Sequence, residues 1–520
     1  MSPARSLTVH EYDGGWANLP HLTDDASFTG RSRDFGRRLL TLRMTSLVAA
    51  EDRENIPAES RSQELVKGDA RHIRISRDDV LTYDPPRDPS PRGLRRVLRS
   101  IRNRSPLLYD ELRDLELLRH RRSLTTRAAP RDYDGEFVPG GAHDDSRVVI
   151  APAAPEGAER AVIIGLHWFE LGGAERWAFE TVKLVREAGL LPIVLTNRES
   201  HQPWIGRPEL DGALIIPFSE PTVASQTPGV EELLRGILGA FDIRGVVVHH
   251  NQWLYDRLPW IAASRPGIPI VDSTHIVEYR GGGYPRSSVV AAPSITAHHV
   301  ISPTLARWMT ETQGIPAAKV FMAPLGGLTV ELKDAKFRER NPDAPFTVAF
   351  VGRFARQKAP EVFIAMAGRV RAAGRTVRFI MHGDGELAGW ADEFIALKGL
   401  GDVIERRSSA VPVDETLAEA DLLVVTSHNE GLTLTTLEAI AHGVPVVSTD
   451  VGAQADIVPR QGLISRRVHR SVSEAARRVL ALESDEAARR ELWTRERKSE
   501  KKLLSQQSAT EWFAQEVGTW

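Results

Sequence analysis

Two glutamates, Glu430 and Glu438, stand eight residues apart where a strand gives way to a helix. The run before them, DLLVVTS, is apolar enough to form a buried strand, so Glu430 belongs to the loop at its carboxyl end. Free N–H groups and the helix dipole favour a phosphate at the start of the next helix, and an acidic side chain there can accept both ribose hydroxyls. The amides at that position belong to Gly431, Leu432, Thr433 and Leu434. The pattern indicates a nucleotide site, with two solvated surface glutamates as the alternative.

A basic pair, Arg353 and Lys358, follows the strand-like run Phe346–Val351. Cations in a loop after a strand can neutralise the charge that builds on a departing diphosphate. A metal ion would serve the same purpose, but it requires acidic ligands at a strand end, and no convincing Asp-x-Asp pair stands in such a place. We therefore expect no metal site and no cofactor. An ordinary exposed pair of basic residues remains the alternative for these two side chains.

Gly172 and Gly173 come directly after the first apolar strand run and open a helix. Because glycine lacks a Cβ, the backbone there can approach a phosphate or an acceptor closely. Histidines follow two other strand runs, His275 after one and the pair His249 and His250 after the other. The histidine pair could suggest zinc, but no third ligand stands at a suitable spacing. Each of these histidines is either a substrate contact or a buried structural residue.

Apolar strand runs alternate with helical stretches from about residue 160 to the end of the chain. This alternation is typical of parallel sheets that helices cover on both faces. It predicts an α/β fold of two tandem Rossmann-like, doubly wound domains, at residues 158–335 and 336–505, facing a cleft in which ligands bind. A last helix is expected within residues 506–520, and a partly helical, arginine-rich extension of unknown role, residues 1–157, precedes the domains.

Length and composition limit the class of protein. The chain has 520 residues, which suggests about three domains. Hydrophobic residues make up 42% and charged residues 26%, which excludes a mostly disordered or collagen-like chain. The net charge of −2 offers no basic field for nucleic acid, and the absence of cysteine excludes disulfides, thiolate nucleophiles and iron–sulfur clusters. No apolar run is long enough for a signal peptide or a membrane span, so we expect a cytoplasmic protein.

Residues 92–122 form a basic segment, with ten arginines against four acidic residues. Leucines at positions 108, 112, 115 and 118 recur at helical spacing and predict a basic amphipathic helix. Such a helix either docks on the neighbouring domain or contacts an anionic surface, such as lipid headgroups or a polyanionic acceptor. The second interpretation would make the protein peripheral to a membrane.

The order of these segments resembles the retaining GT-B glycosyltransferases, in particular glycosyltransferase family four. The segment from Glu430 to Glu438 resembles the E-x7-E motif of that family. The other motifs, in the family's order, are Gly172-Gly173, Gly352-Arg353 with Lys358, His382-Gly383-Asp384-Gly385 and Gly443-Val444-Pro445-Val446-Val447. Each motif is weak alone, but five in this order are specific. The resemblance covers roughly residues 160–500.

This resemblance implies a nucleotide-diphosphate sugar donor held between the basic pair and the two glutamates. By the same resemblance, Glu438 holds the ribose, Glu430 contacts the donor sugar and His275 reaches the sugar near the reacting carbon. Gly383 belongs to the substrate-binding loop after the second domain's second strand. The family also implies a metal-independent, front-face reaction, in which the leaving phosphate helps to deprotonate the acceptor, and a C-terminal helix that crosses back onto the first domain.

Several residues depart from the family's pattern. Thr433 and Ala359 stand where many relatives have glycine, and a Cβ at Thr433 could alter how closely the donor approaches. Leu432 replaces an aromatic residue, and Leu325-Gly326 replaces an Asn-Gly pair. None of these changes removes a proposed charged contact. They therefore bear on the identity of the donor more than on the fold.

We expect a retaining glycosyltransferase that moves a sugar from a nucleotide-diphosphate sugar to an acceptor hydroxyl. The acceptor stays open among a glycan, a lipid-linked intermediate, a small molecule and a protein. A catalytically degenerate sugar-nucleotide-binding or scaffolding protein is the alternative from another class. An NAD-dependent dehydrogenase fits poorly, because LHWFELGGAER follows the first strand in place of G-x-G-x-x-G.

Replacing Arg95, Arg96, Arg99 and Arg102 together with glutamine should weaken binding to anionic vesicles. Each basic side chain near such a surface contributes about 1 kcal/mol, and salt screens this attraction. Co-sedimentation with phosphatidylserine vesicles at low and high salt measures the effect. Equal co-sedimentation of the variant and the wild type at low salt would discard the membrane interpretation.

Overall fold

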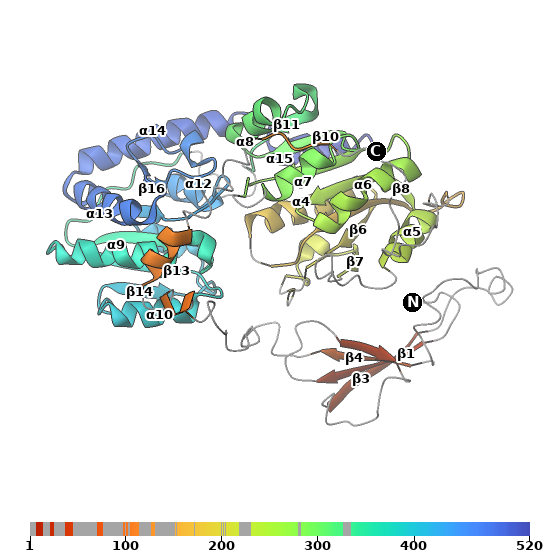
Figure 1. The fold of residues 1–520 in the computed structure, drawn as a ribbon, viewed down its shortest axis with the longest axis horizontal. Coiled ribbons are helices and arrows are strands. Elements are labelled where there is room, and N and C mark those ends of the chain that lie inside the picture. The colour runs from red at the N-terminus through yellow and green to blue at the C-terminus, as the bar shows by residue number, and fades with distance from the viewer. Residues whose placement is uncertain are drawn as a thin grey trace. The chain divides into compact units, whose positions relative to one another are not determined.

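The computed structural model describes the chain in separate stretches up to residue 325 and continuously from residue 334 (Figure 1). The described residues are 7–13, 21–24, 37–44, 70–75, 97–98, 100–101, 105–113, 126–130, 151, 153–170, 172–198, 200, 202, 204–217, 230–278, 282–325 and 334–520. The chain divides into two compact units. The first comprises residues 1–84, 132–271 and 520, and the second comprises residues 85–131 and 272–519.

A small sheet lies in the N-terminal extension. Its strands are β1 (Leu7–Asp13), β2 (His21–Asp24), β3 (Arg37–Met44) and β4 (Ala70–Ile75). They run in the order β2-β4-β1-β3, with β1 antiparallel to β3 and parallel to β4. We did not predict this sheet, because the many arginines obscure its pattern. The alternation of Ile73 and Ile75 with Arg74 is nevertheless typical of a strand.

A sheet of seven strands follows, in the order β11-β10-β9-β8-β5-β6-β7. Its strands are β5 (Arg160–Leu166), β6 (Leu191–Leu195), β7 (Leu214–Ile216), β8 (Asp242–His249), β9 (Ile270–Thr274), β10 (Ala297–Val300) and β11 (Val320–Met322). The connecting helices include α4 (Gly173–Glu187), α5 (Val230–Ala240), α6 (Gln252–Ser264), α7 (Gly283–Val290) and α8 (Pro303–Arg307). Strand β5 pairs in parallel with both β6 and β8. The strand order therefore reverses beside β5, and the carboxyl ends of β5 and β8 flank a topological switch point, where α/β sheets bind ligands.

Asn251 fastens helix α6 to this sheet. Its side chain accepts a hydrogen bond from the N–H of Leu254 at 2.9 Å, which caps the helix. The same side chain donates to the carbonyls of Leu166 at 3.0 Å and Leu195 at 3.4 Å. Because Asn251 is fully buried and bonded on both sides, it holds together the ends of β5 and β6.

A second parallel sheet has six strands in the order β14-β13-β12-β15-β16-β17. Its strands are β12 (Phe346–Val351), β13 (Val377–His382), β14 (Ile404–Arg407), β15 (Leu422–Val425), β16 (Val446–Thr449) and β17 (Leu463–Ile464). Its helices are α9 (Pro360–Ala372), α10 (Ala388–Leu397), α11 (Val413–Glu419), α12 (Leu434–Ala441), α13 (Val468–Ser484) and α14 (Glu486–Leu504). Because β12 lies between β13 and β15, a second switch point falls at the carboxyl ends of β12 and β15. The two sheets confirm the predicted α/β class with two Rossmann-like domains.

One face of the six-stranded sheet carries an apolar core. Every second residue of β12, namely Phe346, Val348 and Phe350, belongs to it, as the alternation of a strand requires. Helices α9, α10 and α13 cover this face. Phe363 of α9 packs against Phe350 with ring centroids 5.6 Å apart and against Phe379 at 5.9 Å. This packing fixes the strand ends from which the loops at the second switch point begin.

The last helix, α15 (Ala509–Val517), lies against β10 and β11. Its start is capped by Ser508, which accepts from the N–H of Glu511. Trp512 stacks on His299 of β10 at 5.2 Å and on Phe321 of β11 at 5.5 Å. Aromatic stacking and the cap together hold this helix on strands that come two hundred residues earlier in the chain.

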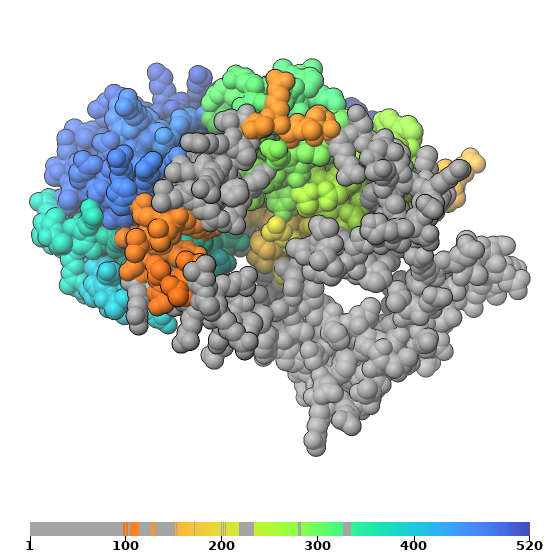
Figure 2. Space-filling view, viewed as in Figure 1, coloured from red at the N-terminus to blue at the C-terminus, as the bar shows by residue number. Residues whose placement is uncertain are grey.

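The predicted basic helix is present at residues 106–113, which we call the docking helix. Of the leucines that predicted it, Leu108 and Leu112 do not lie on the docked face. Leu108 and Leu112 are 54% and 48% exposed, whereas Asp110 is only 5% exposed. The docking helix lies on the domain of the six-stranded sheet, where Figure 2 shows it in orange. Residues 97–98, 100–101 and 105 of the predicted segment are also described, whereas its remaining residues, including 95, 96, 99 and 102, lie outside the described residues. None of the helices in the described stretches is long and apolar enough to cross a membrane.

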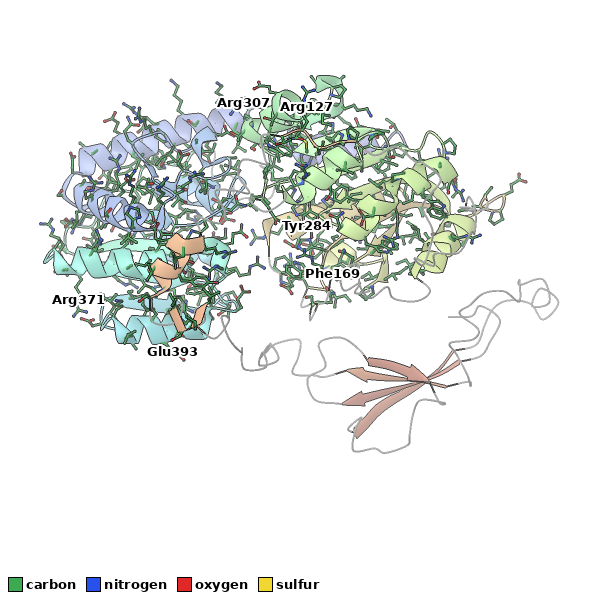
Figure 3. The ribbon with its side chains drawn as sticks, in the orientation of Figure 1. Arg127, Phe169, Tyr284, Arg307, Arg371 and Glu393 are labelled. Carbon is green, nitrogen blue, oxygen red and sulfur yellow. The ribbon has the colours of Figure 1, made fainter. Side chains whose placement is uncertain are left out.

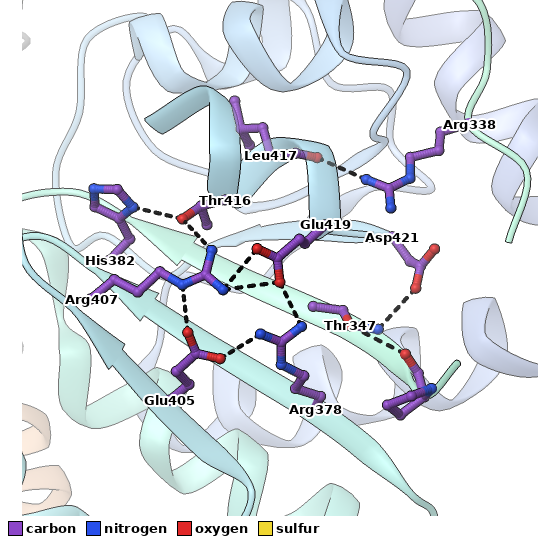
Figure 4. A network of polar contacts seen from close by, with 11 residues as sticks. Arg338, Thr347, Arg378, His382, Glu405, Arg407, Thr416, Leu417, Glu419 and Asp421 are labelled. Carbon is purple, nitrogen blue, oxygen red and sulfur yellow. Dashed lines mark hydrogen bonds and ion pairs between the residues drawn. The ribbon is translucent and has the colours of Figure 1, made fainter. Parts of the chain in front are cut away.

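A network of charged side chains lies on the edge strand β14 and its neighbour β13 (Figure 4). Arg407 pairs with Glu405 at 2.6 Å and with Glu419 at 2.9 Å. The hydrogen bond to Glu419 raises the pKa of Arg407, so the guanidinium stays charged. Arg407 also donates to the hydroxyl of Thr416 at 3.1 Å, and that hydroxyl lies 2.8 Å from Nδ1 of His382. Because His382 ends β13, the network holds the strand end that leads into one of the predicted binding loops.

Glu496 of α14 is fully buried in the same domain and accepts a hydrogen bond from the N–H of Val446 at 3.0 Å. Burial raises the pKa of Glu496 well above its usual value of 4.5, and the like charge of Glu500 raises it further. A carboxyl group whose folded pKa is raised does not oppose folding at low pH. It lowers stability as the pH rises from the unfolded pKa toward the folded pKa.

Glu496→Gln should therefore stabilise the protein at about pH 7.5, since glutamine keeps an acceptor for Val446 but cannot ionise. The gain should shrink as the pH falls and vanish at about pH 4, where the wild-type carboxyl is protonated in both states. Thermal unfolding followed by circular dichroism across this pH range measures it. A variant that melts below the wild type at pH 7.5 would contradict this account of Glu496.

Candidate functional site

The two loops at the second switch point carry the predicted basic and acidic residues. Lys358 ends the turn Arg356–Lys358 after β12, and Glu430 lies in the loop after β15. Lys358 Nζ lies 2.6 Å from Glu430 Oε1, and the side chain of Lys358 is 23% exposed against 6% for Glu430. Because an ammonium group has three donors, Lys358 can hold Glu430 and still donate to an anion.

Gly352 and Gly383 bring the loops after β12 and β13 into backbone contact. A Cβ on Gly383 would lie 2.2 Å from the carbonyl oxygen of Gly352, and its φ of 129° is one that other residues rarely adopt. Next along the chain, the N–H of Phe354 donates to the carbonyl of Asp384 at 2.7 Å. Arg353 thus stands between two residues whose backbone is fixed, which limits the region that its side chain can reach.

His275 lies against the loop of the predicted glutamate. A Cβ on Gly431 would lie 2.1 Å from the carbonyl oxygen of His275, so only glycine fits at that position. The side chain of Asn429 donates to the carbonyl of Val277 at 3.3 Å. These contacts bring the loop after β9 next to the loop that carries Glu430.

A chain of hydrogen bonds from the interior holds the ring of His275. Its Nε2 lies 3.2 Å from the hydroxyl of Ser273, which lies 2.8 Å from Nδ1 of His299. Burial lowers the pKa of His299 to about 4, so this ring is neutral, and its Nε2–H donates to the carbonyl of Ala323 at 2.8 Å. Nδ1 of His299 is then the acceptor from Ser273, whose oxygen accepts from Nε2–H of His275. The interior thus selects the tautomer of His275.

The loop after β16 supports the Glu430 loop, and our sequence analysis missed it. A Cβ on Gly452 would lie 1.6 Å from the carbonyl oxygen of Glu430. Gln454 is fully buried and donates to the carbonyl of Gly431 at 3.4 Å and to the hydroxyl of Thr433 at 3.1 Å. Strands β15 and β16 are neighbours in the sheet, so the predicted order of adjacent parallel strands is the signal that could have found these residues.

The start of α12 lies where the sequence predicted an anion site. Thr433 is the N-cap residue, Leu434 is the first helical residue and Glu438 comes about one turn later. The side chains of Leu432 and Glu438 are nearly buried, each 8% exposed. The hydroxyl of Thr433 lies 2.5 Å from that of Thr436. The departure from glycine at Thr433 therefore adds hydrogen bonds inside the domain.

At the first switch point, Gly172 and Gly173 open helix α4 above a buried carboxylate. A Cβ on Gly172 would lie 2.0 Å from Oε2 of Glu175, so the glycine makes room for that side chain. Oε1 of Glu175 accepts from Trp168 at 2.9 Å and lies 3.0 Å from Nε2 of His167. Burial by itself raises the pKa of Glu175, but its interactions with His167 outweigh this and hold the pKa below its usual value.

Two residues of the same domain, His250 and Gln202, have left-handed backbone. Their φ values are 54° and 52°, which cost on the order of 1–3 kcal/mol for residues other than glycine and occur mainly at functional sites. Burial lowers the pKa of His250 to about 3, with the charge of His167 adding to the effect, so His250 is neutral at pH 7. Gln202 accepts from the N–H of Phe169, a fully buried residue labelled in Figure 3, at 2.6 Å.

His249, the other candidate histidine, is part of the core. Its Nε2 lies 2.9 Å from the hydroxyl of Thr181, and its ring meets Trp177 edge-on at 6.3 Å. The residue is only 2% exposed. We therefore interpret it as structural and keep His250 in the candidate site.

One group of side chains in the described part of the chain has the composition of a metal site. Single ligand atoms of Asp110, Glu361 and His428 lie within 4.8 Å of one another. Asp110, however, accepts from Arg356, and Glu361 lies 3.3 Å from Nε2 of His428. Because both carboxylates have cationic or hydrogen-bonding partners, we interpret the group as an ion-pair network.

Comparison with known proteins assigns a family to this arrangement. Residues 345–485, which include both loops of the second switch point, match the family described as glycosyl transferases group 1. Over 368 residues the chain is 23% identical to the D-inositol 3-phosphate glycosyltransferase of Stackebrandtia nassauensis, which covers 61% of the chain and 82% of that protein. The domain of the six-stranded sheet therefore carries the match to the group 1 glycosyltransferases. The enzyme of the same name from Segniliparus rotundus is 28% identical over 243 residues, which span 42% of this chain and 54% of that protein.

Solved structures show the same fold. The Anabaena protein HepE, in complex with UDP and glucose, has a TM-score of 0.53 at 15% identity, covering 69% of this chain and 98% of HepE. Sucrose-phosphate synthase from Thermosynechococcus elongatus has a TM-score of 0.52 at 16% identity, with coverages of 69% and 98%. These likenesses confirm the predicted GT-B fold, and the family match places residues 345–485 among the group 1 glycosyltransferases.

Gly431→Ala should destabilise this protein, because the new Cβ would lie 2.1 Å from the backbone oxygen of His275. Overpacking of this kind costs roughly 1–3 kcal/mol, so the melting temperature should fall by several degrees. Gly389→Ala in α10 is the matched control, since its Cβ would meet nothing within 4 Å and alanine favours a helix. Differential scanning calorimetry compares the two, and equal melting temperatures would argue against the His275 contact.

Proposed function

We propose that this protein transfers a sugar, with retention, from a nucleotide-diphosphate sugar to an acceptor hydroxyl. The observation that carries the proposal is the 2.6 Å contact of Lys358 with Glu430 at the switch point of the six-stranded sheet. A sugar nucleotide offers an anionic diphosphate and a hydroxylated sugar. These are the chemical complements of an ammonium group and of a carboxylate, respectively.

In this proposal, the basic residues bind the leaving group and the acidic residues bind hydroxyls. Lys358 and Arg353 neutralise the charge that develops on the diphosphate as the bond to the sugar breaks. Glu430 accepts from hydroxyls of the donor sugar, and Glu438 accepts from the ribose. His275 contacts the sugar near the reacting carbon. The backbone amides at the start of α12 and the loop that carries Gly383, after β13, complete the donor site.

The proposed reaction takes place on one face of the sugar. The bond between the anomeric carbon and the phosphate oxygen breaks, and the acceptor oxygen bonds to the same carbon from the same side. The acceptor's proton passes to the leaving phosphate. Because the protein's own cations stabilise the diphosphate, the reaction should proceed in the presence of a chelator.

The relatives indicate which donor to test first. HepE has been solved with UDP and glucose and with UDP-glucose. We propose a UDP-sugar as the donor of this chain, bound by residues 336–505. A panel of sugar nucleotides in a thermal-shift assay would rank the candidates, because a ligand that binds only the native state raises the melting temperature.

We place acceptor binding in residues 158–335, at the carboxyl ends of β5 and β8. Glu175, His167 and His250 form a buried polar group there, and a carboxylate with neutral and donor-bearing rings suits an acceptor rich in hydroxyls. The relatives named D-inositol 3-phosphate glycosyltransferase make a polyol phosphate the first small acceptor to test. Glycan and lipid-linked acceptors should be tested next. In this proposal, the helix within residues 506–520 crosses back to the acceptor domain.

Lys358→Ala should lower kcat by roughly 10²–10³, since it removes a donor aimed at charge that develops in the transition state. Glu438→Ala should instead raise the donor KM by roughly tenfold or more, because it removes a charge-assisted hydrogen bond to the bound nucleotide. Initial rates of donor hydrolysis or transfer at varied UDP-sugar concentration measure both effects.

Arg369→Ala and Glu415→Gln are the matched controls, because both residues are exposed on helices of the same domain. Both controls should keep wild-type kinetics. Binding of a sugar nucleotide by calorimetry, without turnover on any donor or acceptor, would overturn the enzymatic proposal in favour of a binding protein. Full activity in Lys358→Ala would overturn the assignment of the leaving-group site.

A further inference from the structure

A buried carboxylate of the N-terminal extension contacts both loops of the candidate donor site. Asp110 of the docking helix is 5% exposed, and aspartate is rarely buried without a partner. Its Oδ1 accepts a hydrogen bond from Arg356, which lies in the loop after β12. Its Oδ2 lies 3.8 Å from Nε2 of His428, which lies in the loop after β15. Asp110 is therefore a link between two loops that come from different strands.

The two loops are also bonded to each other beside Asp110. The N–H of His428 donates to the carbonyl of Gln357 at 2.8 Å, and the side chain of Gln357 donates to the carbonyl of Asn429 at 2.9 Å. Lys358 follows Gln357 directly, and Glu430 follows Asn429 directly. The residues that Asp110 contacts thus stand two positions before each member of the proposed donor pair.

Arg356 is held on the docking helix by a second contact. Its guanidinium carbon lies 4.5 Å from the centre of the Tyr109 ring, within the range of a cation–π interaction. Its partner Asp110 is more buried than Arg356, whose side chain is 26% exposed. Removing the charge of Asp110 would therefore leave a partly buried guanidinium without its carboxylate and loosen the turn that ends in Lys358.

Two further contacts hold the docking helix on the domain without involving Arg356 or His428. Glu111 accepts from the backbone N–H of His469, at the start of α13, at 2.6 Å. Leu107 packs against an apolar cluster formed by Ala359, Val362, Val468 and Val472. Ala359 has a φ of 51°, and its buried methyl group lies in this cluster directly after Lys358. The helix therefore stays docked when the Asp110 contact alone is altered.

We propose that Asp110 is a positioning residue for the donor site. Through Arg356 and His428, the docking helix of the extension sets the loops after β12 and β15 at the spacing that the donor requires. This inference rests on the proposed function, because these loops carry Lys358 and Glu430. If the inference is right, the affinity for the donor depends on the carboxylate of Asp110, which is not among the residues that we propose to bind the donor.

Asp110→Asn in the full chain tests the inference with UDP-glucose, or with the UDP-sugar that stabilises the wild type most. We expect the donor KM to rise roughly tenfold while kcat changes less than about twofold, since the chemical groups themselves are unchanged. Asp110→Glu should recover much of the affinity. Asp110→Arg combined with Arg356→Asp should bind donor more tightly than either single variant, because the pair is restored with reversed charge.

Hydrogen exchange on the donor-free protein tests the positioning separately from the chemistry. Amides of residues 353–358 and 427–431 should exchange faster in Asp110→Asn than in the wild type, while those of β12 and β15 should not. Glu111→Gln is the matched control, as it alters a neighbouring carboxylate that contacts α13 and keeps an acceptor for His469.

The outcomes separate the two proposals. If Asp110→Asn changes neither the exchange of the two loops nor the donor KM, the inference is wrong. An equal rise in KM for Glu111→Gln also contradicts it, because helix docking in general would then be responsible. If the wild type binds no sugar nucleotide, the proposed function fails, while the exchange rates still decide whether Asp110 orders the loops.

Discussion

The contact between Lys358 Nζ and Glu430 Oε1 is the interaction on which the rest of this structure depends functionally. A nearly buried carboxylate orients the ammonium group before any ligand arrives, so less side-chain freedom is lost when a phosphate binds. The carboxylate also balances the lysine charge in the free protein. A sugar nucleotide brings both an anion and hydroxyl donors, and each has a preformed partner at this point.

Backbone contacts between loops keep that pair in place. The carbonyl of Gly352 lies where a side chain on Gly383 would be, and the carbonyl of Glu430 lies where a side chain on Gly452 would be. His275 meets Gly431 in the same way. Such contacts leave no space for a Cβ, so the positions of the loops are determined by main chain and not by mobile side chains. This explains why glycines, rather than charged residues alone, mark the site in the sequence.

The main elements and the local motifs could be predicted from the sequence, because both depend on short-range patterns. The strand Phe346–Val351 has the predicted limits, and the helix Ala509–Val517 lies within the predicted residues 506–520. Helix α6 was not predicted, since Pro259 lies inside it, and strands of two or three residues such as β7 and β17 give no periodic signal. The partners of the site residues could not be predicted either. Asp110 and Gln454 reach the donor loops only through tertiary packing, and no spacing in the sequence records such a contact.

A crystal structure of the full chain with an unhydrolysed UDP-sugar tests the central claim most directly. The account predicts diphosphate oxygens within about 3 Å of Lys358 Nζ and of the Arg353 guanidinium, with the ribose hydroxyls on Glu438. The docking helix should remain in contact with both donor loops in that complex. A nucleotide bound away from the carboxyl ends of β12 and β15, or a diphosphate that neither basic side chain contacts, would contradict the account.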